Sequence, residues 1–206
     1  MAHAENNPNS PTDISVSCHG ALITGGCKKH PTTSKSPSTA SDLKMPKSRP
    51  TLADVREAAG KGDAAAQLQL AMAYASGGGV PKDEAESLKW LRKSAEQGYA
   101  EAQVNLAGCY EKGVMVPEDA VEAVKWFRKS ADHLYDGAQY SLGQCYAEGR
   151  GVPKDNVTAS MWFYVAAEWG HEKAKEDLKT ISLTMTPAEV LKAQQLGKEW
   201  MVSRNQ

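Results

Sequence analysis

Apolar residues recur along most of this chain at a constant spacing of 36 residues. Small, aliphatic and aromatic residues return at the same places in each unit, and so do a proline and an aspartate. The matching columns are Ala66, Ala102, Ala138 and Ala174; Leu70, Leu106, Leu142 and Leu178; Tyr74, Tyr110 and Tyr146; Pro81, Pro117 and Pro153; Asp83, Asp119 and Asp155; Trp90, Trp126 and Trp162; and Ala95, Ala131 and Ala167. Columns that stay in register without a gap indicate a repeat array.

Each unit is expected to form two helices. In the first half of the first unit, Ala66, Leu70 and Tyr74 are four residues apart and therefore share one helix face. A glycine-rich stretch ending in Pro81 stops this helix, because proline cannot continue the hydrogen-bond ladder. Asp83 then supplies an N-cap for the second helix. The pattern predicts an all-α chain, a solenoid of helix-turn-helix units.

Three full repeats are predicted, at residues 63–98, 99–134 and 135–170. A lone helix at 51–62 is expected to cover the N-terminal face and a cap repeat at 171–206 the C-terminal face, because a stacked array needs a capping unit at each end. Thr186 and Glu189 form a capping box around Pro187. The last helix is therefore expected to begin earlier than the repeat spacing requires.

The first 50 residues differ in composition from the rest. They hold six of the ten prolines, whereas all five tryptophans, seven tyrosines and two phenylalanines lie after them. This small amount of apolar surface cannot offset the conformational entropy that the segment would lose on ordering. Residues 1–50 are therefore predicted to be a disordered Ser/Thr/Pro-rich tail.

The tail contains two cysteines and two histidines, at Cys18, His19, Cys27 and His30. Their spacing is unlike the common zinc patterns, so no metal or cofactor is predicted. Met45 is an alternative start of translation.

The charge of the chain is nearly balanced, with 24 basic and 25 acidic residues. This balance favours neither a nucleic acid nor an acidic membrane as a partner. No apolar run reaches the roughly 18 residues that a membrane span needs, and no basic segment followed by an apolar stretch marks an export signal. A cytoplasmic protein is therefore expected, with export through an atypical signal as the alternative.

Cys109 and Cys145 occupy the same column one repeat apart. Neighbouring helices pack about 8–10 Å apart, beyond the roughly 7 Å between Cα atoms that a disulfide spans. Both are therefore expected to be reduced thiols packed between helices, which favours a reducing compartment.

The segment from Tyr146 to Asp155 reads Tyr-Ala-Glu-Gly-Arg-Gly-Val-Pro-Lys-Asp. Together with the Ala-x3-Leu and Trp-x3-(Ser/Ala)-Ala columns, it resembles the Sel-1-like repeat, a family related to tetratricopeptide repeats. The resemblance covers about residues 51–206. It implies a right-handed α-solenoid and an adaptor that binds other proteins or peptides.

The relation to tetratricopeptide repeats also implies which face of each first helix lines the concave groove. When Leu70 and Ala71 are matched to the tetratricopeptide leucine and small residue, the groove columns differ between repeats where neighbouring columns do not. The candidate partner-binding residues are Leu68, Met72, Glu101, Val104, Asn105, Glu111, Tyr140 and Gln144. Tyr140 is expected to be an outward-facing aromatic anchor beside an apolar strip, and the two glutamates favour a basic partner. The alternative is a face that is only solvated.

The expected function is thus a monomeric, non-catalytic protein-interaction module. Two alternatives stay open: a structural spacer, and a hydrolase that binds β-lactams, because some cysteine-rich members of the similar family are linked to β-lactam hydrolysis. The Ser-x-x-Lys pattern of such chemistry occurs at Ser41 and Lys44, in the tail, where nothing holds a base in place. His133 and His171 are isolated at helix boundaries, so no catalytic triad is predicted.

Overall fold

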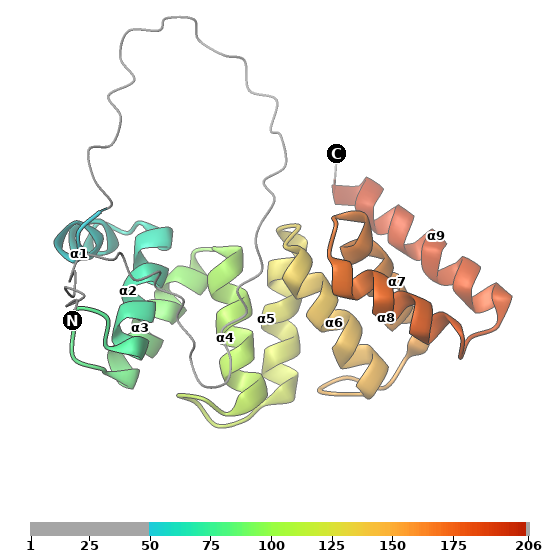
Figure 1. Ribbon diagram of the computed structural model, residues 1–206, viewed down its shortest axis with the longest axis horizontal. Coiled ribbons are helices and arrows are strands. Elements are labelled where there is room, and N and C mark those ends of the chain that lie inside the picture. The colour runs from blue at the N-terminus through green and yellow to red at the C-terminus, as the bar shows by residue number, and fades with distance from the viewer. Residues whose placement is uncertain (1–49, 205–206) are drawn as a thin grey trace, which may run out of the picture.

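The computed structural model describes residues 50–204. Within this range it contains α-helices and no strand: α1 (Leu52–Gly60), α2 (Ala64–Ser76), α3 (Glu84–Glu96), α4 (Ala100–Lys112), α5 (Ala120–Asp132), α6 (Asp136–Glu148), α7 (Asn156–Glu168), α8 (Glu172–Ser182) and α9 (Pro187–Arg204). Figure 1 shows them following one another in chain order along an elongated molecule. The predicted all-α solenoid is confirmed.

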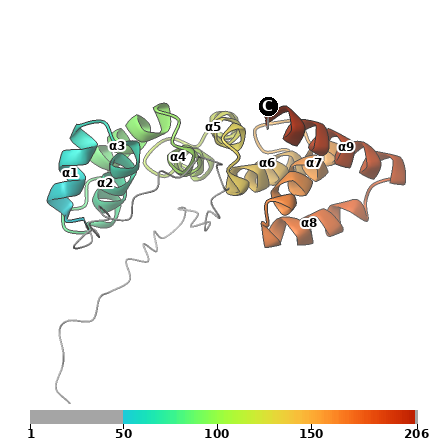
Figure 2. The ribbon, with the colours of Figure 1, turned by 90° about the horizontal axis from the view of Figure 1, so that it is seen from above.

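Consecutive helices pack in pairs: α2 with α3, α4 with α5, and α6 with α7. Each pair packs on the next through α3 with α4 and through α5 with α6. Seen from above in Figure 2, the array bends, and α2 and α8 at its two ends lie to one side of α4 and α6. The first helices α2, α4, α6 and α8 therefore follow the concave side, and α3, α5 and α9 lie on the opposite side.

The turn from the first to the second helix is built alike in all three repeats. Gly77, Gly113 and Gly149 end α2, α4 and α6 in the left-handed conformation, which glycine adopts without strain. The N–H of the following N-cap aspartate then donates to a tyrosine carbonyl, over 3.0 Å from Asp83 to Tyr74, 2.8 Å from Asp119 to Tyr110 and 2.9 Å from Asp155 to Tyr146. The aspartate column of the sequence thus encodes both the turn and the helix start.

Two turns of the middle repeat keep this backbone conformation without glycine. Met115 and Leu134 have φ angles of 63° and 60°, at the places where the first repeat has Gly79 and Gly98. A residue with a Cβ pays about 1–3 kcal/mol in this region. The packing of the middle repeat must therefore hold both turns in place.

The first helices of the inner repeats are enclosed on nearly every side. Every residue from 102 to 109 of α4 is buried, and so is every residue from 137 to 143 of α6. A helix at a protein surface normally shows polar, exposed residues every three or four positions. α4 instead lies between α3 and α5, so little of its surface is left for a partner.

The C-terminal cap departs from the pairing of the full repeats, because α8 and α9 both pack mainly on α7. The ring of Trp200 meets that of Trp162 edge to face at a centroid distance of 5.2 Å. Arg204 at the end of α9 forms an ion pair of 2.6 Å with Asp132 at the end of α5. The capping box expected of Thr186 and Glu189 is present, with the Thr186 N–H donating to the glutamate over 2.8 Å.

The predicted tail, with Cys18, His19, Cys27, His30 and Ser41, lies outside the described residues. None of the helices between residues 50 and 204 has the length and apolar character that crossing a membrane requires.

Candidate protein-interaction surface

Half of the predicted groove residues are buried. Leu68, Val104, Asn105 and Tyr140 are exposed to only 3%, 1%, 3% and 8%. The expectation of an apolar strip with an outward-facing Tyr140 is therefore wrong, since none of these side chains offers surface to a partner. Leu68, Val104 and Tyr140 occupy one column, and its variation between repeats does not mark an exposed surface.

The physical reason is the enclosure of the first helices. Leu68 and Val104 belong to the main apolar core together with Leu106 and Trp126. Tyr140 belongs to a second cluster with Phe163, at the junction between the last full repeat and the cap. A spacing of 36 residues identifies equivalent positions, but it does not tell how many neighbours enclose each of them.

The other predicted groove residues, Met72, Glu101, Glu111 and Gln144, are partly exposed. Glu111 is engaged within the chain, because its carboxylate pairs with the guanidinium of Arg150. Among the described residues Glu101 has no cation beside it and accepts a long hydrogen bond of 3.5 Å from the Tyr99 hydroxyl. Of the two glutamates expected to favour a basic partner, Glu101 alone keeps a charge that no described cation pairs.

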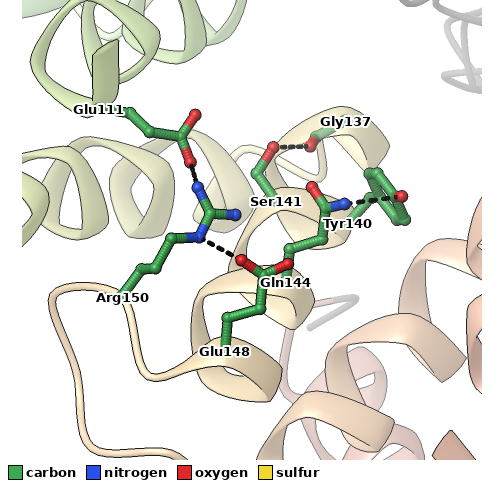
Figure 3. A network of polar contacts seen from close by, with 7 residues as sticks. All are labelled: Glu111, Gly137, Tyr140, Ser141, Gln144, Glu148 and Arg150. Atoms are coloured by element: carbon green, nitrogen blue, oxygen red, sulfur yellow. Dashed lines mark hydrogen bonds and ion pairs between the residues drawn. The ribbon is translucent and has the colours of Figure 1, made fainter. Parts of the chain in front are cut away.

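Arg150 bridges two repeats, as Figure 3 shows. It lies in the turn between α6 and α7, and it pairs with Glu111 of α4 and, through its Nε, with Glu148 of α6 over 2.8 Å. Sequence reasoning missed this residue. A signal was present, because Arg150 is the charged member of a turn column that otherwise contains Gly78 and Val114.

Tyr140 joins the last full repeat to the cap through both its hydroxyl and its ring. The hydroxyl donates to Asp177 of α8 over 2.8 Å and accepts from the Gln144 amide over 2.9 Å; Figure 3 shows the second contact. The ring stacks on His171 at a centroid distance of 4.4 Å. Burial, and then the Asp177 carboxylate, raise the pKa of Tyr140 well above its usual value, so the hydroxyl stays protonated.

The two described cysteines are buried, as expected from their column, and they form no disulfide with each other. Burial raises the pKa of the Cys145 thiol to about 11. Because the thiolate is the reactive form of cysteine, this thiol is inert at neutral pH. It contributes to packing rather than to chemistry.

Between residues 50 and 204 no group of three or more histidine, cysteine or acidic side chains is arranged to hold a metal ion. The Ser41 and Lys44 pair of the hydrolase alternative lies outside this range.

A family model for the Sel1 repeat matches residues 64–99, 100–133 and 137–171. These spans make up about half of the chain. The chain belongs to the Sel1 repeat family. Each matched span begins within two residues of a repeat expected from the 36-residue spacing.

Two solved structures resemble this Sel1 repeat protein. A Sel1 repeat protein from Oxalobacter formigenes is 38% identical with a TM-score of 0.61, and the match covers 63% of this chain and 97% of that one. The second is c5321, a protective antigen present in uropathogenic Escherichia coli strains that displays an SLR fold. It is 26% identical with a TM-score of 0.56, and the match covers 73% of this chain and 40% of that one. No curated protein sequence matches.

Sel1 repeats are in general modules for protein–protein interaction, and they serve as scaffolds rather than as enzymes. The predicted class of function is thus supported for this Sel1 repeat protein at the level of its family.

Proposed function

We propose that this protein is a non-catalytic adaptor that binds a partner polypeptide along its concave side. The observation that carries the proposal is the set of partly exposed side chains on the first helices: Met72 on α2, Glu101 on α4 and Gln144 on α6. They supply a thioether, a carboxylate and an amide to one side of the array. Such a mixture suits an extended peptide, whose main chain and side chains alternate between polar and apolar contacts.

The free bonding capacity of two of these groups sets the chemistry of the partner. Gln144 uses its amide N–H toward Tyr140, while its Oε1 accepts no hydrogen bond from the described residues and is available to a peptide N–H. Glu101 has no ion pair among the described residues, so it favours a lysine or arginine on the partner. Glu111 and Glu148 add less attraction than two free carboxylates would, because Arg150 pairs with both and offsets one of their two charges.

A monomer in the cytoplasm is part of the same proposal. Cys109 and Cys145 are buried and form no disulfide with each other, which supports a reducing compartment.

The test selects linear peptides from a random displayed library on the immobilised full chain and measures their affinity by fluorescence anisotropy. Selected peptides should be rich in lysine or arginine. Met72→Glu and Glu101→Lys should each lower the affinity for these peptides by about tenfold or more. Val121→Glu is the matched control, because Val121 is 54% exposed on α5, a second helix, and should leave affinity unchanged. Peptides that lose affinity with the control but not with the concave variants would refute the proposal.

A further inference from the structure

A cavity of about 360 Å³ opens at the edge of the array, between the ends of α3 and α5 and the first turn of α4. Gln103 and Trp126 form its inner wall, and Glu96, Lys129, Asp132 and His133 lie around it. Its volume is within the range of ligand sites in proteins. Met72 and Gln144 are not among its lining residues, so it is distinct from the concave surface.

Comparison with the first repeat explains how the cavity arises. There the amide N–H of Gln67 donates to the Ala59 carbonyl over 3.1 Å, and its Oε1 accepts from the Gln97 amide over 2.6 Å. In the middle repeat the equivalent Gln103 likewise donates to the Ala95 carbonyl over 3.0 Å. Because a carbonyl only accepts hydrogen bonds, this contact defines which end of the Gln103 amide carries the oxygen.

The partner of that oxygen is missing in the middle repeat. His133 stands where the first repeat has Gln97, and its ring lies against the α3–α4 turn, since a Cβ built on Gly98 would be 3.3 Å from its Nε2. The Oε1 of Gln103 is buried and has no hydrogen-bond partner among the described residues. The chain thus lacks an amide donor at the place where its own first repeat supplies one.

A second residue that lines the cavity has an unpaired donor. The indole Nε1–H of Trp126 is buried without an acceptor among the described residues, and Trp126 itself is only 9% exposed. Buried polar groups are rarely left unpaired, because desolvation without a hydrogen bond is costly. Both atoms belong to residues that line the cavity and both are covered in this structure, so a ligand that carries the complementary pair reaches them by displacing the side chains that cover them.

The charges around the cavity favour a neutral ligand. The ammonium of Lys129 lies 3.8 Å from the centroid of the Trp126 ring, and Glu96 brings one opposite charge to the lining. Asp132 is already paired with Arg204 of α9 over 2.6 Å. The charges of Glu96, Lys129, Asp132 and Arg204 therefore sum to zero, which favours neither an anion nor a cation.

We propose that this cavity binds the side-chain carboxamide of a glutamine or asparagine on a partner polypeptide. The ligand N–H donates to Gln103 Oε1, as Gln97 does to Gln67, and the ligand carbonyl accepts from Trp126 Nε1. The apolar part of the ligand side chain lies near the Trp126 indole. This site goes beyond the proposed concave surface and does not depend on it.

The test follows the indole Nε1–H resonance of Trp126 in the ¹⁵N-labelled full chain, assigned with a Trp126→Phe variant. The probes are acetyl-Ala-Gln-Ala-N-methylamide and its Met analogue, which has a similar length but no carboxamide, together with free acetamide. A saturable downfield shift with the Gln peptide alone is expected. Equal shifts with the Met peptide, or no saturable shift at millimolar concentration, would overturn the proposal. If acetamide binds as tightly as the Gln peptide, the ligand is a free amide, and the proposal that it belongs to a polypeptide is overturned.

Two variants at one position provide the control. His133→Gln introduces the amide that Gln97 has in the first repeat, so it should occupy Gln103 Oε1 and abolish the shift while keeping the melting temperature. His133→Ala removes the same imidazole without adding a donor and should retain binding. Equal behaviour of the two variants would contradict the proposal. Met72→Glu should retain the shift, so failure of the concave surface and failure of this cavity are distinguished.

Discussion

Tyr140 is the clearest case at the scale of single residues, because its role is the reverse of the one expected from its variability. It is 8% exposed, packs beside Phe163 at a ring distance of 5.7 Å and bonds Asp177 and Gln144. Each contact reaches another helix or another turn of α6. The residue therefore contributes to stability and not to a binding surface.

Tyr140→Phe should lower the free energy of unfolding by about 1–2 kcal/mol, because it removes the hydroxyl and leaves the half-buried Asp177 without its donor. Tyr140→Ala should cost about 3–5 kcal/mol through the cavity it leaves. Urea denaturation measures both. The control is Tyr110→Phe, whose hydroxyl accepts only a long bond of 3.4 Å from Arg92 at the surface and should change stability by less than about 0.5 kcal/mol. Comparable losses for the two Tyr→Phe variants would contradict this role.

His171 is the N-cap of α8, and it caps through an unprotonated nitrogen. Its Nδ1 accepts from the Ala174 N–H over 3.2 Å. Burial lowers the pKa of His171; the Asp136 carboxylate on α6 and Asp177 oppose this shift, and the Lys173 ammonium adds to it. The folded state thus keeps the imidazole neutral at a pH where the unfolded chain takes up a proton.

Stability should therefore fall as the pH decreases from about 6.5, the ordinary pKa of histidine, toward the lower folded value. In this pH window the unfolded state binds more protons than the folded state does. Above the window the stabilisation that the neutral His171 contributes is fully present. His171→Asn keeps a good N-cap that does not titrate. Melting temperatures between pH 7.5 and 5.5 should fall more steeply for the wild type than for this variant, and parallel curves would contradict the assignment.

At the scale of helices, the approach of α6 to α7 depends on a missing side chain. The column that contains Ala71 and Ala107 in the first two repeats has Gly143 in the third. A Cβ on Gly143 would lie 2.4 Å from the ring of Phe163, a residue that also packs against Tyr140. Glycine is needed here for close approach and not for backbone freedom.

Gly143→Ala should therefore destabilise the protein by about 1–3 kcal/mol through overpacking, although alanine is the better helix former. Gly60→Ala is the matched control, because Gly60 ends α1 with a helical backbone and a Cβ added there would meet no atom within 4 Å. It should stabilise by about 0.5–1 kcal/mol. Thermal and urea unfolding would check the opposite signs, and a shared sign would refute the close contact.

For the whole molecule, stability is expected to be highest in the middle of the array, because each repeat contacts only its neighbours. α4 has buried residues throughout 102–109 and contacts a helix on each side. In α1 only Ala59 is buried, and in α9 only Ala193 and Gly197 are. The two ends have a partner on one side.

Native-state hydrogen exchange should show this gradient. Amides of α4 to α7 should open with free energies near that of global unfolding, roughly 5–15 kcal/mol, and those of α1 with several kcal/mol less. Uniform protection from α1 to α9 would instead show that the array unfolds as one cooperative unit.

The fold and the family were readable from the sequence, because both depend on periodic features. The 36-residue columns record which positions must pack, and aspartate with glycine or proline records where each helix starts and stops. These are local properties, so Asp83, Asp119 and Asp155 cap their helices as expected. The burial of Cys109 and Cys145 also followed from their register.

The surface did not follow from the sequence, because exposure depends on the number of neighbours that the array brings around a position. Variation between repeats marked Leu68, Val104 and Tyr140 as candidates, yet stacking encloses all three. The pairing of Arg150 with Glu111 joins residues 39 positions apart. The Gln103 oxygen is unpaired in the middle repeat, where His133 replaces the glutamine of the first repeat. Contacts between repeats are not periodic in the sequence, so three-dimensional packing was needed to find them.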